Sequence, residues 1–262
     1  MISSSKLTCM PIILRSPIVR AMSQSSINGG SAYASLRNQV RKVEPENYLC
    51  GSLMPSRARD SFFVMRAFNA EVAAVRDATR GTVATARVRM AFWRDVIDCA
   101  FRSGGGSVSG AAGAHPLAAP LAAAIHAHSH TRRWLDRLVD ARDADLDGLP
   151  HATVASLEAY AEATHSSLLY LSLESVGVRD VHADHAASHI GKAAGLANVI
   201  RGLPVHARLG QRYFPDDLLT KVSQECKTLT LLYFINNVLT NDPFPLPSFS
   251  FHHPHTHFRS MD

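Results

Sequence analysis

Residues 60–75 read DSFFVMRAFNAEVAAV, and this stretch decides the class of fold. Its bulky apolar residues recur at steps of three and four, which places them on one face of an α-helix. They are Phe62, Met65, Phe68, Val72 and Val75. Only three prolines lie between Pro55 and Pro204, so few positions force a helix to end. With an apolar fraction of 46% over 262 residues, the sequence predicts an all-α protein with a substantial core.

The same spacing predicts further helices on both sides of a glycine-rich break. The segment 103–106 should end the second helix, because three successive glycines lose more backbone entropy than a helix offsets. The fifth helix has a face of small residues, which lets another helix pack closely against it. The positions that define the later faces are Val88, Phe92, Val96 and Cys99; Leu117, Leu121 and Ile125; Val154, Leu157, Tyr160, Thr164, Leu168 and Leu171; and Ala186, Ile190, Ala193, Ala197 and Ile200.

The net charge of +5 is concentrated at the front of the chain. Six Lys and Arg residues precede the first acidic residue, Glu44, and the same segment is rich in serine. This composition is typical of an organelle transit peptide, so we expect residues 1–43 to be a mitochondrial transit peptide and a disordered lead. No window approaches the ~18 to 20 apolar residues of a membrane span. We therefore expect an imported protein that is peripheral or soluble. Its positive charge is expected to serve as a targeting signal rather than as a nucleic-acid-binding surface.

The helical domain should occupy residues 44–225. Beyond it, an apolar run at 229–239 is followed by four prolines that forbid regular helix, at positions 243, 245, 247 and 254. We expect residues 226–262 to be a divergent, unstructured tail. The four cysteines form no CxxC pair, which suits a reducing compartment or inert buried thiols better than a disulfide framework.

Six segments between residues 44 and 225 can be compared with a known family of proteins. They are YLCGSLMP (48–55), FFVMRAFNAE (62–71), MAFWRD (90–95), YAEATHSS (160–167), GLANVIR (195–201) and GQRYFP (210–215). Together they resemble the signature helices of squalene and phytoene synthases. The resemblance implies an isoprenoid-synthase-like helical bundle. After residue 225 the similarity stops, so the C-terminal helices of such a bundle are expected to be missing or replaced.

Enzymes of this family ionise a prenyl diphosphate, and that chemistry requires Mg²⁺ ions held by carboxylate oxygens. The resemblance implies two aspartate-rich clusters on facing helices. Here Ala73 and Ala74 stand at the first two positions of the first cluster, and only Asp77 remains. In the second cluster Gly202 replaces an aspartate, and the acidic pair that should follow at 205–206 is valine and histidine.

One carboxylate cannot hold the metal cluster, and the loss of several ligands raises the barrier by many orders of magnitude. We therefore expect a protein that is not an enzyme, with no catalytic, cofactor-binding or metal-binding residues and no cofactor. Four residues remain as candidates for a vestigial pocket that could hold an anionic or isoprenoid ligand: Asp77, Arg94, Asn198 and Arg201.

Two further stretches, SSLLYL (166–171) and VHADHAASHIGKA (181–193), resemble a non-catalytic branch of the superfamily. That resemblance implies an assembly factor in the early biogenesis of mitochondrial respiratory complex I, the NADH:ubiquinone oxidoreductase. It implies complex I subunits or other assembly factors as partners, and a peripheral place on the matrix side of the inner membrane. A lipid or isoprenoid ligand stays open. So does a second class of function, a divergent Mg²⁺-dependent prenyltransferase acting on isoprenyl diphosphates.

Three other clusters invite comparison with metal sites. His182, His185 and His189 share a helix face and could present imidazoles to zinc, although a polar stripe or a packed interface is the commoner reason for such spacing. Asp136 and Asp140 are interleaved with arginines, which indicates a salt-bridged, solvated face. The tail histidines lie in a segment without a predicted fold, and such a segment does not hold side chains in the fixed arrangement that a metal site needs. They are His252, His253, His255 and His257.

Overall fold

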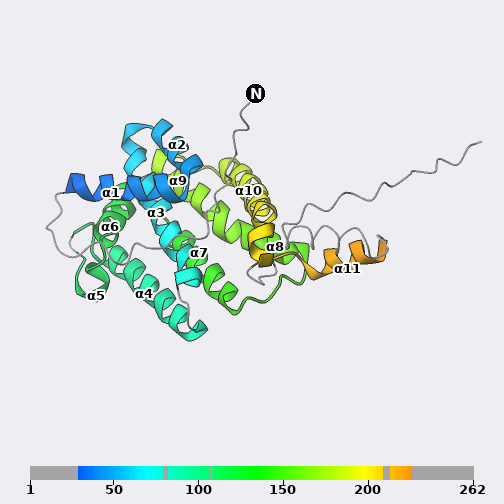
Figure 1. Cartoon of the computed structure of the whole chain (residues 1–262). Coiled ribbons are helices and arrows are strands. Elements are labelled where there is room, and N and C mark those ends of the chain that lie inside the picture. The colour runs from blue at the N-terminus through cyan, green and yellow to red at the C-terminus, as the bar shows by residue number, and fades with distance from the viewer. Residues whose placement is uncertain (1–28, 79–81, 107, 209–212, 226–262) are drawn as a thin grey trace, which may run out of the picture.

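The all-α class is confirmed: in a computed structural model that describes residues 29–78, 82–106, 108–208 and 213–225, every regular element is helical (Figure 1). The expected transit peptide up to residue 28 and the expected tail lie outside these ranges. The described elements are α1 (Gly29–Val43), α2 (Pro45–Leu53), α3 (Ser56–Ala78), α4 (Val83–Arg102), α5 (Gly110–Gly113), α6 (Ala118–His128), α7 (Arg132–Ala144), η1 (Asp145–Asp147), α8 (Val154–Ala161), η2 (Glu162–Ser166), α9 (Ser167–Val176), α10 (Val181–Arg208) and α11 (Asp216–Glu225).

α3 forms the centre of the bundle and contacts α1, α2, α4, α6, α7 and α9. Its predicted face is buried, and the five side chains that define it are at most 5% exposed: Phe62, Met65, Phe68, Val72 and Val75. The ring of Phe68 meets Trp93 of α4 edge to face, with centroids 5.5 Å apart, a favoured aromatic geometry. Burying each large apolar side chain contributes about 1.5 to 3 kcal/mol, so this face anchors the fold.

The folded domain begins earlier than the sequence predicted. We expected it to start at residue 44, but α1 packs on α3. Leu36 and Val40 of α1 are 6% and 1% exposed, and Gln39 donates a 2.5 Å hydrogen bond to Glu71 of α3. The segment has the composition of a transit peptide, but it also contains these two apolar residues one helical turn apart, and they were not recognised as part of the core.

α4 ends where the glycine run predicted, but it is rotated from its expected orientation. Its last residue is Arg102, and the glycines that follow at 104 and 105 adopt positive φ angles of 60° and 81°. Val88, expected in the core, is 69% exposed, whereas Met90 and Trp93 are buried. The larger side chains remove more apolar area from water, and they set the rotation of the helix.

α10 is also rotated. The apolar face expected in the core points outward: Ile190 and Ile200 are 61% and 60% exposed. The buried face lies on the opposite side of the helix and consists of Ala187, Gly191, Gly195 and Val199. A Cβ built on Gly191 would lie 2.5 Å from the Cα of Ser166 in η2. The glycines therefore allow a backbone contact that the alanine and isoleucine face cannot make.

A buried polar network joins α3, α7 and α9. Glu174, 8% exposed, accepts hydrogen bonds from the backbone N–H of Thr131 at 2.9 Å and from its hydroxyl at 2.5 Å. The Nδ1 atom of His130 lies 3.2 Å from the same carboxylate, and its Nε2 lies 2.8 Å from the hydroxyl of Ser61. The carboxylate thus supports the start of α7 from within the core.

Candidate functional site

The predicted helix from 154 to 171 contains one turn of π-helix. α8 continues without a break into η2, the π-turn, and then into α9. Such single turns are frequent at functional sites, because the wider turn changes which side chains face inward. Here η2 contributes His165, which faces α3, α7 and α10.

Four side chains from these elements form what we call the arginine–histidine cluster: Arg66, Arg142, His165 and Asn198. The amide Nδ2 of Asn198 lies 2.8 Å from the Nε2 of His165. Arg201, one turn further along α10, donates to the Asn198 carbonyl at 2.8 Å. The structure therefore brings together two of the four residues that the resemblance suggested, Asn198 and Arg201.

The α3 side of this cluster is held by a chain of hydrogen bonds. Asn69 donates to Glu44 at 2.9 Å and accepts from Arg142 at 2.8 Å. Arg66 forms an ion pair with Glu44 at 3.5 Å, and its side chain is 13% exposed. Among the described residues, the Nε atoms of Arg66 and Arg142 are buried without a hydrogen-bond partner. Buried cationic donors without partners are costly, and an anionic group placed there would satisfy them.

His165 is neutral within this cluster. Burial lowers its pKa to about 4, and the positive charges of Arg142 and Arg66 act in the same direction. A neutral imidazole can accept the Asn198 hydrogen bond at Nε2. The cluster therefore holds two guanidinium charges beside an uncharged histidine.

This arrangement predicts that stability falls as the pH falls from about 6.5 to about 4. The folded-state pKa of His165 lies below the ordinary value of 6.5, so the unfolded chain binds the proton more readily. The shift corresponds to at most about 3 kcal/mol, present above pH 6.5 and lost through this window. Urea unfolding at several pH values should show a flatter profile for His165→Gln than for the wild type. A parallel profile, or equal flattening in the exposed control His182→Gln, would contradict the prediction.

The other two vestigial-pocket candidates, Asp77 and Arg94, lie outside the contacts that define this cluster. Asp77 is an exposed residue in the last turn of α3, and the charges that act on it are those of Arg76 and His206. Arg94 of α4 donates 2.8 Å hydrogen bonds to Asp140 and Asp143 of α7. It therefore clamps two helices together on the outside of the bundle.

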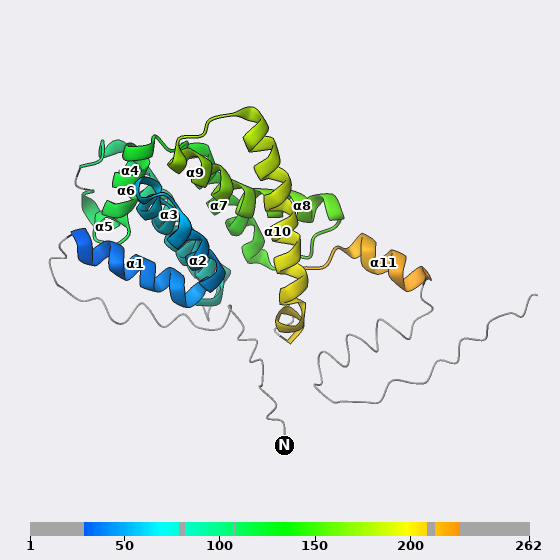
Figure 2. The ribbon, with the colours of Figure 1, turned by 90° about the horizontal axis from the view of Figure 1, so that it is seen from above.

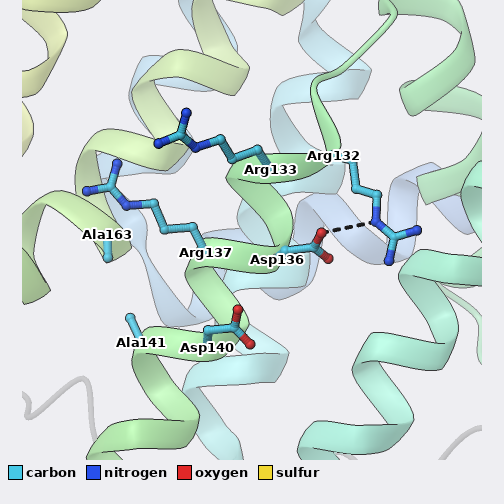
Figure 3. Close-up of a pocket in the computed structure, with 7 residues that line it drawn as sticks. All are labelled: Arg132, Arg133, Asp136, Arg137, Asp140, Ala141 and Ala163. Carbon is cyan, nitrogen blue, oxygen red and sulfur yellow. Dashed lines mark hydrogen bonds and ion pairs between the residues drawn. The ribbon is translucent and has the colours of Figure 1, made fainter.

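The outer face of α7 is the salt-bridged surface that the sequence predicted. Arg132 pairs with Asp136 at 3.0 Å, and an open hollow of about 600 Å³ lies alongside. Figure 3 shows Arg133 and Arg137 extending toward Ala163 on one side of α7, whereas Arg132 and Asp136 turn to the other. Arg137 also lies 3.6 Å from Glu162 of η2, so part of this charge is neutralised within the protein.

A second hollow, of about 330 Å³, lies between α7, η1 and α8 and is lined by Asp145, His151 and Tyr160 among others. The hydroxyl of Tyr213 donates to Asp145 at 2.6 Å, and Arg76 pairs with the same carboxylate at 2.8 Å. Burial strongly raises the pKa of Tyr213, so this hydroxyl is a hydrogen-bond donor at all physiological pH values.

The described residues contain no group of three or more His, Cys, Asp or Glu side chains placed to hold a metal ion. His185 and His189 contact each other, with their Nε2 atoms 3.4 Å apart, but the three-imidazole zinc hypothesis gains no support within these ranges. The tail histidines lie outside them. Within the same ranges, no helix has both the length and the apolar content needed to cross a membrane.

Most of the chain matches the model of a known protein family. The model of the squalene/phytoene synthase family matches residues 40–231, which include every helix of the arginine–histidine cluster. The chain belongs to the squalene/phytoene synthase family. The all-helical bundle agrees with this membership. The family match starts at residue 40, within α1. This agrees with the packing of α1 on the rest of the bundle.

The chain is also similar to proteins named NADH dehydrogenase (ubiquinone) complex I, assembly factor 6. It is 38% identical to the human protein over 81% of this chain and 63% of that protein. It is 40% identical to the bovine protein over 71% of this chain and 54% of that one. A presqualene diphosphate synthase of Rhodopseudomonas palustris is 23% identical over 67% of this chain. The chain thus spans only 54% to 63% of these two assembly factors.

Sequence reasoning found Asn198 and Arg201 but missed the residues that complete the cluster. Arg66 and His165 lay inside segments that carried the family resemblance, yet nothing in their spacing marked them. Glu44 and Arg142 come from distant parts of the chain and are joined only by the fold. The one available signal was an arginine, Arg66, among the core-facing residues of a predicted helix. A charged side chain is rarely buried without a partner, so a partner was to be expected.

Proposed function

We propose that this protein is a non-catalytic assembly factor in the early biogenesis of mitochondrial respiratory complex I. The observation that carries the proposal is its 38% to 40% identity, over 71% to 81% of the chain, to proteins named as complex I assembly factors. Its partners are then complex I subunits or other assembly factors. The front segment, with six basic residues before Glu44, would direct it to mitochondria, where it would lie peripherally on the matrix side of the inner membrane.

The site supports a binding role better than catalysis of prenyl transfer. At the positions that should supply metal-binding carboxylates, α3 carries Ala73 and Ala74, and alanine cannot ligate Mg²⁺. The arginine–histidine cluster instead holds the guanidinium groups of Arg66 and Arg142, whose Nε atoms are buried without a hydrogen-bond partner. Such a cluster would neutralise an anionic headgroup directly, without a metal, and would retain an isoprenoid or lipid as a structural ligand.

Deleting the gene in the source organism should remove mature complex I. Native gel electrophoresis with an NADH-dehydrogenase stain should show loss of the complete complex, and NADH:ubiquinone activity should fall to background. Other respiratory complexes serve as the internal control. Restoration by the full chain, and its failure when residues 1–28 are removed, would connect the effect to import. Normal complex I in the deleted cells would sink the proposal.

The prenyltransferase alternative has a separate test. Purified protein is incubated with farnesyl or geranylgeranyl diphosphate, with and without Mg²⁺, and released pyrophosphate is measured. Magnesium-dependent release that is lost in Asp77→Asn would replace the non-catalytic proposal with an enzymatic one. We expect no release above the rate without protein.

A further inference from the structure

Two histidines contact each other on the exposed side of α10, close to the start of this helix. The ring centroids of His185 and His189 are 4.7 Å apart, with an interplanar angle of 85°, and their Nε2 atoms are 3.4 Å apart. Both residues are exposed. Figure 2 shows the first turns of α10 at the outer edge of the bundle, after the loop that follows α9. An ion in solution can therefore reach the pair.

The separation of the two Nε2 atoms matches the distance between two nitrogen ligands of a tetrahedral zinc ion. Zinc binds imidazole nitrogen at about 2.0 to 2.1 Å, so two ligands at the tetrahedral angle lie about 3.3 to 3.4 Å apart. A metal ion that holds neighbouring ligands at right angles, such as square-planar copper, would need them about 2.9 Å apart. The observed distance is 3.4 Å, so a zinc ion fits between the two rings without a change in the backbone of α10.

The position of the two histidines in the sequence explains this geometry. They are four residues apart on one helix, so they lie one turn apart on the same face. Helices of zinc metalloproteases present two zinc-binding histidines at this same spacing, with a glutamate directly after the first histidine as the general base. Here the residue after His185 is Ala186. The pair therefore has the spacing that binds zinc but lacks the base that activates water.

Two cationic side chains close to the pair in the sequence are compensated by carboxylates. Lys192, one turn after His189, lies 3.2 Å from Glu162 of η2. Arg179, just before the start of α10, lies 3.7 Å from Glu174 of α9. Because each positive charge has a negative partner within the protein, their repulsion of a divalent cation bound at the pair is reduced.

We propose that His185 and His189 bind one zinc ion through their Nε2 atoms, with water in the two remaining tetrahedral positions. Both protein ligands come from neighbouring turns of one helix, so the site forms in this chain without any segment that its longer relatives carry. His182 takes no part, since the described residues contain no group of three or more such ligands placed around one ion. The inference does not depend on the proposed function.

The test measures zinc binding to the full chain by equilibrium dialysis. The starting variant removes the four tail histidines, which would compete for the ion, by the changes His252→Gln, His253→Gln, His255→Gln and His257→Gln. Adding His185→Gln/His189→Gln should remove one bound zinc ion per chain. Either single change should weaken binding at least about tenfold, because the second ligand no longer adds its intramolecular contribution. The matched control is His182→Gln, an exposed histidine on the same helix, which should leave binding unchanged.

X-ray absorption at the zinc edge identifies the ligands. The bound ion should show imidazole nitrogens at about 2.0 to 2.1 Å, whereas sulfur at about 2.3 Å would place it on cysteine and overturn the proposal. Three other results would also overturn it: no zinc bound by the starting variant, an equal loss of binding in His182→Gln, and half a zinc ion per chain with a zinc-dependent dimer in sedimentation. None of these measurements depends on complex I, so normal complex I in deleted cells would remove the proposed function and leave the zinc result untouched.

Discussion

Replacing Glu174 with alanine is expected to destabilise the protein by about 3 to 5 kcal/mol, because removing one partner of a buried polar network leaves the others unsatisfied. The backbone N–H and hydroxyl of Thr131 and the Nδ1 of His130 all lie within hydrogen-bond distance of this carboxylate. The imidazole of His130 is completely buried, so water cannot replace the lost contact. Urea unfolding at neutral pH measures the loss.

The matched control for Glu174 is Glu46→Ala. Glu46 is 64% exposed and pairs only loosely with Arg201, at 3.5 Å, so its loss should cost less than about 1 kcal/mol. The acid range gives a second check. Burial raises the pKa of Glu174, but hydrogen bonds from His130 and Thr131 outweigh it, and the net pKa lies below 4.5. The stabilising contribution is therefore present above pH 4.5 and fades below it. Equal costs for the two variants would show that the network contributes nothing.

Replacing Gly191 with alanine is expected to cost about 3 kcal/mol or more. A Cβ at this position would lie 2.5 Å from the Cα and 2.6 Å from the backbone nitrogen of Ser166. Backbone atoms inside a helix cannot step aside, so α10 must move away from η2 and lose contact along its buried face. That movement should also disturb the Asn198 to His165 contact. Thermal unfolding measures the loss of stability, and a fluorescent lipid or prenyl diphosphate probe measures ligand binding at the arginine–histidine cluster.

Gly202→Ala, on the same helix, is the control for Gly191→Ala. There the Cβ would meet only the ring of His206, the end of a side chain that can rotate. The gain in helix propensity, about 0.5 to 1 kcal/mol, should offset that adjustment. A Gly191→Ala protein as stable as Gly202→Ala would mean that the close approach of α10 and η2 is not required.

The parts of the fold that could be predicted are those where large apolar side chains dominate one face. α3 was predicted correctly because its bulky residues leave only one orientation that removes them from water. α10 was not, because small residues alternate with larger apolar ones on both of its opposite faces, and spacing alone cannot tell the face that needs glycine from the face that carries isoleucine. Only the fold shows that Gly191 meets the backbone of Ser166.

The candidate site was predictable only in part, for a different reason. Asn198 and Arg201 stand one turn apart within a segment of family resemblance, so local sequence was enough to find them. Arg66, Asn69 and Arg142 are joined through Glu44 by two hydrogen bonds and an ion pair that link α3 and α7, and no periodicity reports a contact between residues so far apart. The four-residue prediction also grouped Arg94 with the site, although its partners lie on the outside of α7.

If the proposed transit peptide is cleaved, the packing of α1 limits where the cut can fall. A processing peptidase that cut after Leu36 would remove a core side chain, and one that cut after Val40 would remove two, together with the bond from Gln39 to Glu71. The mature amino terminus should therefore fall before Tyr33, where α1 first packs against the core. Mass spectrometry of the mitochondrial form would identify its first residue directly. The packed helix α1 would then limit how far a peptidase can trim the domain.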